Sequence, residues 1–103
     1  MRALRREYED RFRELSALLF RVDPIGLNFE ENTDEYDSEA RTILPRLGAC
    51  RTPEDVRRVV YEEFAAWFTP DMAARALERV PVAEEVWSWW QGGSRAHSGP
   101  GAA

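Results

Sequence analysis

The sequence of 103 residues contains one cysteine, one histidine and no lysine. The first two shortages argue against an internal disulfide and against catalysis that uses histidine. Cys50 alone forms no internal disulfide, which favours a reducing, cytoplasmic environment. His97 lies in a stretch predicted to be disordered, where it lacks the fixed geometry that a general base or a Cys/His nucleophilic pair needs. All 14 basic residues are arginine, which we interpret as codon bias in a GC-rich bacterial genome.

Long apolar runs are also missing. No run approaches the roughly 18 residues of a membrane span. The arginines at the N-terminus are followed by acidic residues instead of an apolar segment, so no signal peptide is expected. A net charge of −5 argues against nucleic acid as a ligand and fits a basic protein partner.

Apolar residues make up 44% of the chain, which predicts a globular domain, and they recur at steps of three and four, which predicts helices. A tail rich in glycine, serine and alanine cannot bury apolar surface and is expected to be disordered. We therefore predict a compact all-α bundle over residues 1–91 and a disordered tail over 92–103. Four main helices are expected. The first spans residues 3–21, the second runs from about residue 33 to 48, the third starts at residue 53 and the fourth at residue 70. The fourth is expected to break at Pro81 and to resume over residues 82–90.

Helix starts are well marked in two places. Thr52 and Thr69 each precede a proline and an acidic residue, the pattern of an N-cap followed by proline at the first helical position. Asp55 completes a pattern close to a capping box after Thr52. For the second helix, either Thr33 or Asp34 is the expected N-cap.

The stretch from Asp23 to Asp37, DPIGLNFEENTDEYD, holds six acidic residues and no basic one. Such a negative patch steers basic partners. The simpler interpretation is a set of solvated charges and helix caps. The hypothesis we favour is a non-enzymatic interaction module, with an immunity or a regulatory protein as the class that this would fit. Its predicted partner-binding residues in this stretch are Glu30, Glu31, Asp34, Glu35 and Asp37.

Two other functions stay open for the same stretch. Carboxylates at Asp23, Asp34 and Asp37 are hard oxygen ligands of the kind that Ca²⁺ takes, although the spacing does not match an EF-hand loop. Zinc is not expected without thiolate or imidazole ligands, and we expect no cofactor. An enzyme built on a carboxylate pair would need a raised pKa in a pocket.

The tryptophans suggest a second surface. Trp67 lies on the apolar stripe of the third helix and is expected in the core, as is Met72 on the next helix. Trp87 and Trp90 share a helix face, whereas Trp89 points away from them. A short terminal helix cannot bury all three, so Trp87 and Trp90 are candidates for partner binding or for a homodimer contact.

The turn DPIGL, the helix start DEYD and the later VVYEEFAAWF together resemble a small bacterial family of short all-helical proteins of unknown function. The resemblance covers about residues 15 to 70 and implies a fold, not an activity. If DPIGL and DEYD act together, they form a structural clasp built from Asp23, Pro24, Gly26 and Tyr36. In that clasp Tyr36 anchors the loop to the first helix, and Asp37 pairs with an arginine such as Arg41.

Overall fold

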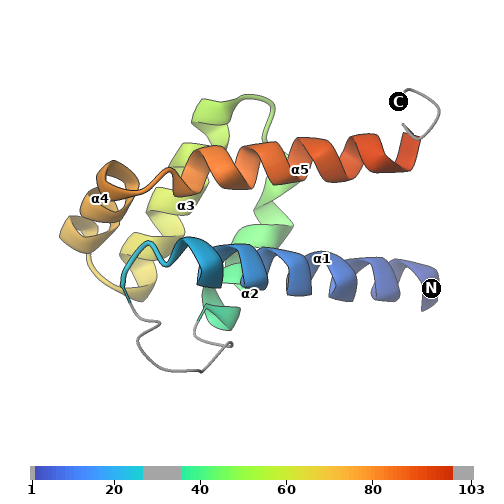
Figure 1. The fold of residues 1–103 in the computed structure, drawn as a ribbon. Helices are drawn as coiled ribbons and strands as arrows, with labels where there is room; N and C mark the ends of the chain where they lie inside the picture. The colour runs from blue at the N-terminus through green and yellow to red at the C-terminus, as the bar shows by residue number, and fades with distance from the viewer. Residues whose placement is uncertain (1, 27–35, 99–103) are drawn as a thin grey trace.

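The computed structural model describes the backbone of residues 2–26 and 36–98 and the side chains of residues 6–26 and 36–92. Within these ranges the chain forms helices and no strand, so the all-α prediction is confirmed. The five helices are α1 (Arg2–Val22), α2 (Asp37–Leu47), α3 (Pro53–Trp67), α4 (Pro70–Arg79) and α5 (Val82–Ser98) (Figure 1).

The described part of the chain has five helices instead of the predicted four because Pro81 ends one helix and starts another. Val80 has φ −135° and ψ 152°, the extended conformation that a following proline favours. The Pro81 carbonyl then accepts the amide of Glu85 at 2.9 Å, which opens α5. The expected break at Pro81 is therefore a full helix boundary.

Two long helices define the shape of the molecule. α1 and α5 run antiparallel, and the start of α1 and the end of α5 lie at the same end of the fold (Figure 1). α3 packs against α2, α4 and α5, and α4 lies at the opposite end. The extents are 42 × 29 × 25 Å.

The core follows the predicted stripes of apolar residues. Its largest fully buried side chains come from α1, α2, α3, α5 and the turns before α2: Leu15, Leu19, Pro24, Tyr36, Ile43, Leu47, Val56, Val60, Phe64, Val82 and Val86. Two residues expected in the core are outside it, since Trp67 is 46% exposed and Met72 is 40% exposed. Trp67 is the last residue of α3 and Met72 lies in the first turn of α4, so both sit at a corner where the core ends.

The capping predictions have two outcomes. Thr52 and Asp55 form a complete capping box, and the Thr69 hydroxyl accepts the Met72 amide at 3.1 Å, as predicted. The predicted start of α2 at Thr33 or Asp34 is wrong, because the helix begins at Asp37 after Tyr36, which makes no side-chain cap. The buried position of Tyr36 sets that start.

The tail was predicted to begin at residue 92, and α5 extends past that point. α5 continues to Ser98, and residues 99–103 lie outside the described part of the chain. Once a helix is held by packing, each further residue extends it without a new nucleus. The packing of Trp89 and Trp90 on α1 provides that support to the turn before the glycines.

Candidate functional site

The chain leaves α1 through a tight turn. Asp23 has a left-handed φ of 52°, a conformation that aspartate tolerates better than most residues. Its amide donates to the Leu19 carbonyl at 2.7 Å. Gly26, with φ 86°, donates its amide to the Asp23 carbonyl at 3.2 Å, and a glycine suits that conformation because it has no Cβ.

Tyr36 joins this turn to the start of α2. Its side chain is fully buried, and its hydroxyl donates to Asp23 Oδ1 at 2.8 Å. The same hydroxyl accepts the backbone amide of Ile25 at 3.0 Å. The ring stacks on Phe64 of α3, with centroids 6.4 Å apart. One phenol therefore ties the exit of α1 to the entry of α2 and to the core.

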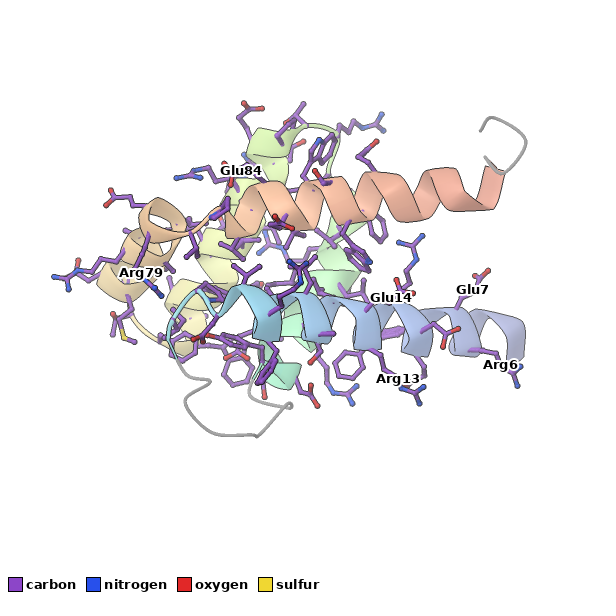
Figure 2. The ribbon with its side chains drawn as sticks, viewed as in Figure 1. Arg6, Glu7, Arg13, Glu14, Arg79 and Glu84 are labelled. Atoms are coloured by element: carbon purple, nitrogen blue, oxygen red, sulfur yellow. The ribbon has the colours of Figure 1, made fainter. Side chains whose placement is uncertain are left out.

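A third element reaches the same point. Arg79 lies in the last turn of α4 (Figure 2). Its Nη2 donates to the carbonyls of Asp23 at 3.2 Å and Pro24 at 2.5 Å. We call Asp23, Pro24, Gly26, Tyr36 and Arg79 the clasp. The first four residues of the clasp were identified from the sequence. Arg79 was missed, because it lies more than fifty positions away in the chain and no local pattern marks it.

The residues around the clasp correct two further expectations. Asp37 Oδ1 accepts a hydrogen bond from the buried Ser16 hydroxyl of α1, and within the described residues Asp37 forms no ion pair of the kind predicted with an arginine. Arg41 instead places its guanidinium carbon 4.1 Å from the centroid of the Phe12 ring. The contact of Asp37 with α1 holds the first turn of α2 in place.

The predicted binding residues Glu30, Glu31, Asp34 and Glu35 lie outside the described residues. What the structure describes is the residues on either side of their segment, which spans residues 27–35. These flanking residues are tied together, because the Ile25 amide donates a hydrogen bond to the Tyr36 hydroxyl. Of the three proposed calcium ligands, Asp34 is also outside the described residues, and Asp23 and Asp37 accept hydroxyl hydrogen bonds.

The C-terminal tryptophans are engaged within the molecule. Trp87, Trp89 and Trp90 are all half-buried against the core. Trp89 does not point away from Trp90 as predicted, since their ring centroids are 5.9 Å apart. Trp89 Nε1 donates to Glu14 Oε1 of α1 at 3.0 Å. This packing against α1 could not be read from the pattern of α5 alone.

The exposed tryptophan is Trp67. Its Nε1 donates to Thr42 Oγ1 of α2 at 3.1 Å, which fixes the orientation of the indole. Its ring adds apolar surface at the corner where Met72 is also exposed. The sequence placed both residues on core stripes because their helical spacing matches those stripes.

Nucleophilic chemistry has little support at Cys50. Burial, followed by the nearby charge of Asp55, raises the pKa of its thiol, which disfavours the thiolate form. Its Sγ donates to the Arg46 carbonyl at 3.6 Å. Arg46 itself bridges Glu62 and Glu63 at 2.7 and 2.9 Å, and these carboxylates raise its pKa. This network ties α2 to α3.

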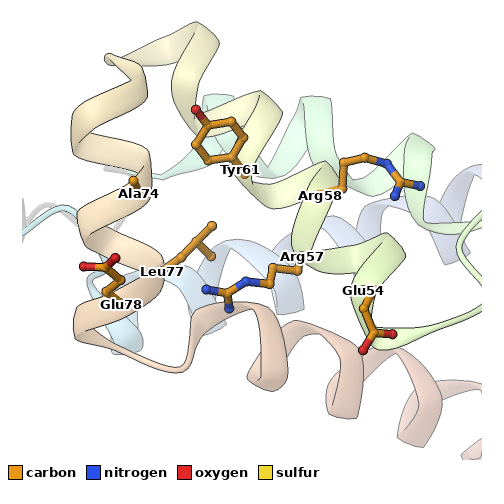
Figure 3. Close-up of a pocket in the computed structure, with 7 residues that line it drawn as sticks. All are labelled: Glu54, Arg57, Arg58, Tyr61, Ala74, Leu77 and Glu78. Carbon is orange, nitrogen blue, oxygen red and sulfur yellow. The ribbon is translucent and has the colours of Figure 1, made fainter.

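A shallow groove of about 390 Å³ lies between α3 and α4 (Figure 3). Two arginines project along it, but each has an acidic neighbour: Arg57 pairs with Glu84 at 3.6 Å and Arg58 with Asp55 at 3.0 Å. Because both arginines are already paired with the protein's own carboxylates, the groove offers no free cation to an anionic ligand.

Comparisons with protein-family models, curated proteins and solved structures found no match. Among the described residues, no group of three or more histidine, cysteine, aspartate or glutamate side chains is placed to hold a metal ion. Within the same residues, no helix has the length and apolar character needed to cross a membrane.

Proposed function

We propose that this protein is a non-enzymatic interaction module that presents the acidic segment of residues 27–35 to a basic protein surface. The observation that carries the proposal is the clasp. It joins the residues that flank a segment containing Glu30, Glu31, Asp34 and Glu35 and no basic residue.

Anchoring matters because a charged segment on a free linker loses conformational entropy when it binds. Here Tyr36 and Arg79 hold the flanking backbone to α1, α3 and α4, so part of that entropy is already lost on folding. The charges of the segment add long-range attraction toward a basic partner, which raises the rate of encounter.

This arrangement fits a protein that inhibits a basic or nucleic-acid-binding partner. Such a protein would have an immunity or a regulatory role. That assignment to a class rests on charge complementarity alone. The resemblance to a small bacterial helical family stays a hypothesis carried by the DPIGL and DEYD motifs. Trp87 and Trp90 stay candidates for a second contact or a homodimer, since both remain half-exposed.

The proposal is tested by capturing partners from host lysate on the immobilised protein at low and at high salt. A variant with Glu30, Glu31 and Glu35 replaced by lysine is expected to lose the captured basic protein, because electrostatic attraction becomes repulsion. High salt is expected to weaken the wild-type complex, because exposed charges are screened within about 10 Å at 0.1 M ionic strength.

The matched control replaces Asp10, Glu54 and Glu78 by lysine. These acids are exposed and take part in none of the ion pairs of the described residues, and their replacement changes the net charge by the same amount. The proposal predicts that this control keeps the partner. Equal binding by the wild type and the first variant would end the proposal.

A further inference from the structure

A second groove lies where α1, the end of α2 and α5 meet. Its volume is about 420 Å³, within the range of small-molecule sites. Tyr8, Leu44, Pro45 and Trp90 form largely apolar walls, and Gly48 lies at its edge. Arg11 of α1 also lines the groove, which places one guanidinium among these walls.

Among the residues whose side chains the structure describes, Arg11 has no carboxylate partner. Two acids of its own helix stand at pairing distance along the sequence, Glu7 four residues before it and Glu14 three residues after it. Neither forms an ion pair with it among the described residues. Glu14 instead accepts the indole N–H of Trp89 at 3.0 Å. The described part of the chain therefore leaves the charge of Arg11 without an anion.

Aromatic rings hold this charge in place. The guanidinium carbon of Arg11 lies 4.7 Å from the ring centroid of Trp90 and 5.6 Å from that of Trp89. Its Nη1 is buried and has no hydrogen-bond acceptor. Cation–π contacts stabilise the group in part, but a half-buried cation without an anion still loses hydration. A carboxylate brought to the exposed side of the guanidinium would offset that loss.

We propose that this groove binds a small apolar carboxylate. The carboxylate contacts the guanidinium of Arg11, and the apolar body of the ligand lies on Leu44, Pro45 and Trp90. Glu7 lines the same groove and is exposed, and its negative charge favours a ligand with a single anionic group over a multiply charged phosphate. This site uses none of the clasp residues, so its test is independent of the test of the acidic segment.

The test uses 4-phenylbutyrate as the probe and its neutral amide, 4-phenylbutyramide, as the matched compound. Binding to the full chain is followed by tryptophan fluorescence and by calorimetry at millimolar probe concentrations. The carboxylate is expected to bind at least about tenfold more tightly than the amide, since a charge-assisted contact is lost in the amide. Equal affinity for the two compounds, or no binding of the carboxylate, would overturn the proposal.

Arg11→Gln is expected to remove the preference for the carboxylate and to leave the fold intact, because it eliminates a half-buried charge that has no anion among the described residues. The control is Arg13→Gln. Figure 2 shows Arg13 projecting from the edge of α1 opposite to Glu7 and Glu14, so its loss is expected to leave probe affinity unchanged. Retention of the preference in Arg11→Gln would contradict the assignment.

Gly48→Trp gives a second, independent variant. Gly48 has φ −61°, and a Cβ at this position meets no atom within 4 Å, so the backbone there accommodates a residue with a side chain. It is expected to obstruct the groove and abolish probe binding while Arg11 stays in place. If light scattering instead showed a wild-type dimer that Gly48→Trp converts to a monomer, a second copy would be the occupant and the carboxylate site would be refuted.

Discussion

At the scale of the residue, the phenol of Tyr36 connects three parts of the fold, although it lies directly after the acidic segment. It is fully buried, donates to Asp23 and accepts from the Ile25 amide. A buried polar atom with both functions satisfied stabilises the fold, whereas removing it leaves the amide of Ile25 without this acceptor. The phenol oxygen therefore supplies two of the hydrogen bonds that hold the clasp together.

Tyr36→Phe is expected to lower the free energy of unfolding by about 1–3 kcal/mol, the cost of leaving buried polar groups without a partner. Urea denaturation followed by far-UV circular dichroism measures the change. Tyr61→Phe is the control, because the hydroxyl of this half-buried tyrosine makes no hydrogen bond among the described residues. A loss for Tyr36→Phe no larger than that of the control would show that the clasp is dispensable.

At the scale of the element, the short connections between helices are set by local chemistry. Thr52 and Thr69 adopt extended backbone geometry and accept the amides of Asp55 and Met72. Each is followed by a proline whose missing N–H is not needed at the first helical position. These two helix starts are local features, and for that reason they could be predicted from sequence.

Thr52→Ala and Thr69→Ala are each expected to cost about 1 kcal/mol of stability, since each leaves an N-terminal amide without its cap. Thermal unfolding of the single and double variants measures the effect, and the two losses are expected to add because the caps belong to different helices. Ser88→Ala, at an exposed position inside α5, is the control and is expected to change little. An unaffected melting temperature in both threonine variants would refute the capping roles.

The capping box of α3 also predicts a pH dependence. The backbone amide of Arg51, followed by the Arg58 guanidinium, lowers the pKa of Asp55 below its usual value near 3.8. Because the folded-state pKa is depressed, the stabilisation is complete above the unfolded value and is lost as the pH falls through the folded one. The stability difference between wild type and Asp55→Asn is therefore expected to be largest at neutral pH and to shrink below about pH 4. A difference independent of pH would contradict this account.

At the scale of the whole molecule, the all-α fold and the helix starts at Pro53 and Pro70 followed from the sequence, because apolar periodicity and caps are local signals. The contacts that make the candidate sites did not follow. Arg79 reaches the clasp, and Trp89 reaches Glu14, from distant parts of the chain. Trp67 was misplaced for a related reason: its spacing matches the core stripe, but α3 ends at that residue.

The calcium hypothesis is tested at this scale as well. Millimolar Ca²⁺ is expected to leave the melting temperature unchanged, because Asp23 and Asp37 are already hydrogen-bonded to the hydroxyls of Tyr36 and Ser16. A cation that bound the folded state selectively would raise the melting temperature in proportion to its occupancy. A rise that is reversed by a chelator would establish the calcium site and would contradict the proposal that the acidic segment binds a protein partner.

The most direct test of the central claim is a titration of the captured partner into the wild type and into the variant with lysine at positions 30, 31 and 35, across a range of salt concentrations. If the acidic segment forms the contact, wild-type affinity is expected to fall steadily with salt, and the variant is expected to bind at least about tenfold more weakly at low salt. Equal affinities and equal salt dependence would contradict the central claim, and would leave the acidic segment with no role in binding.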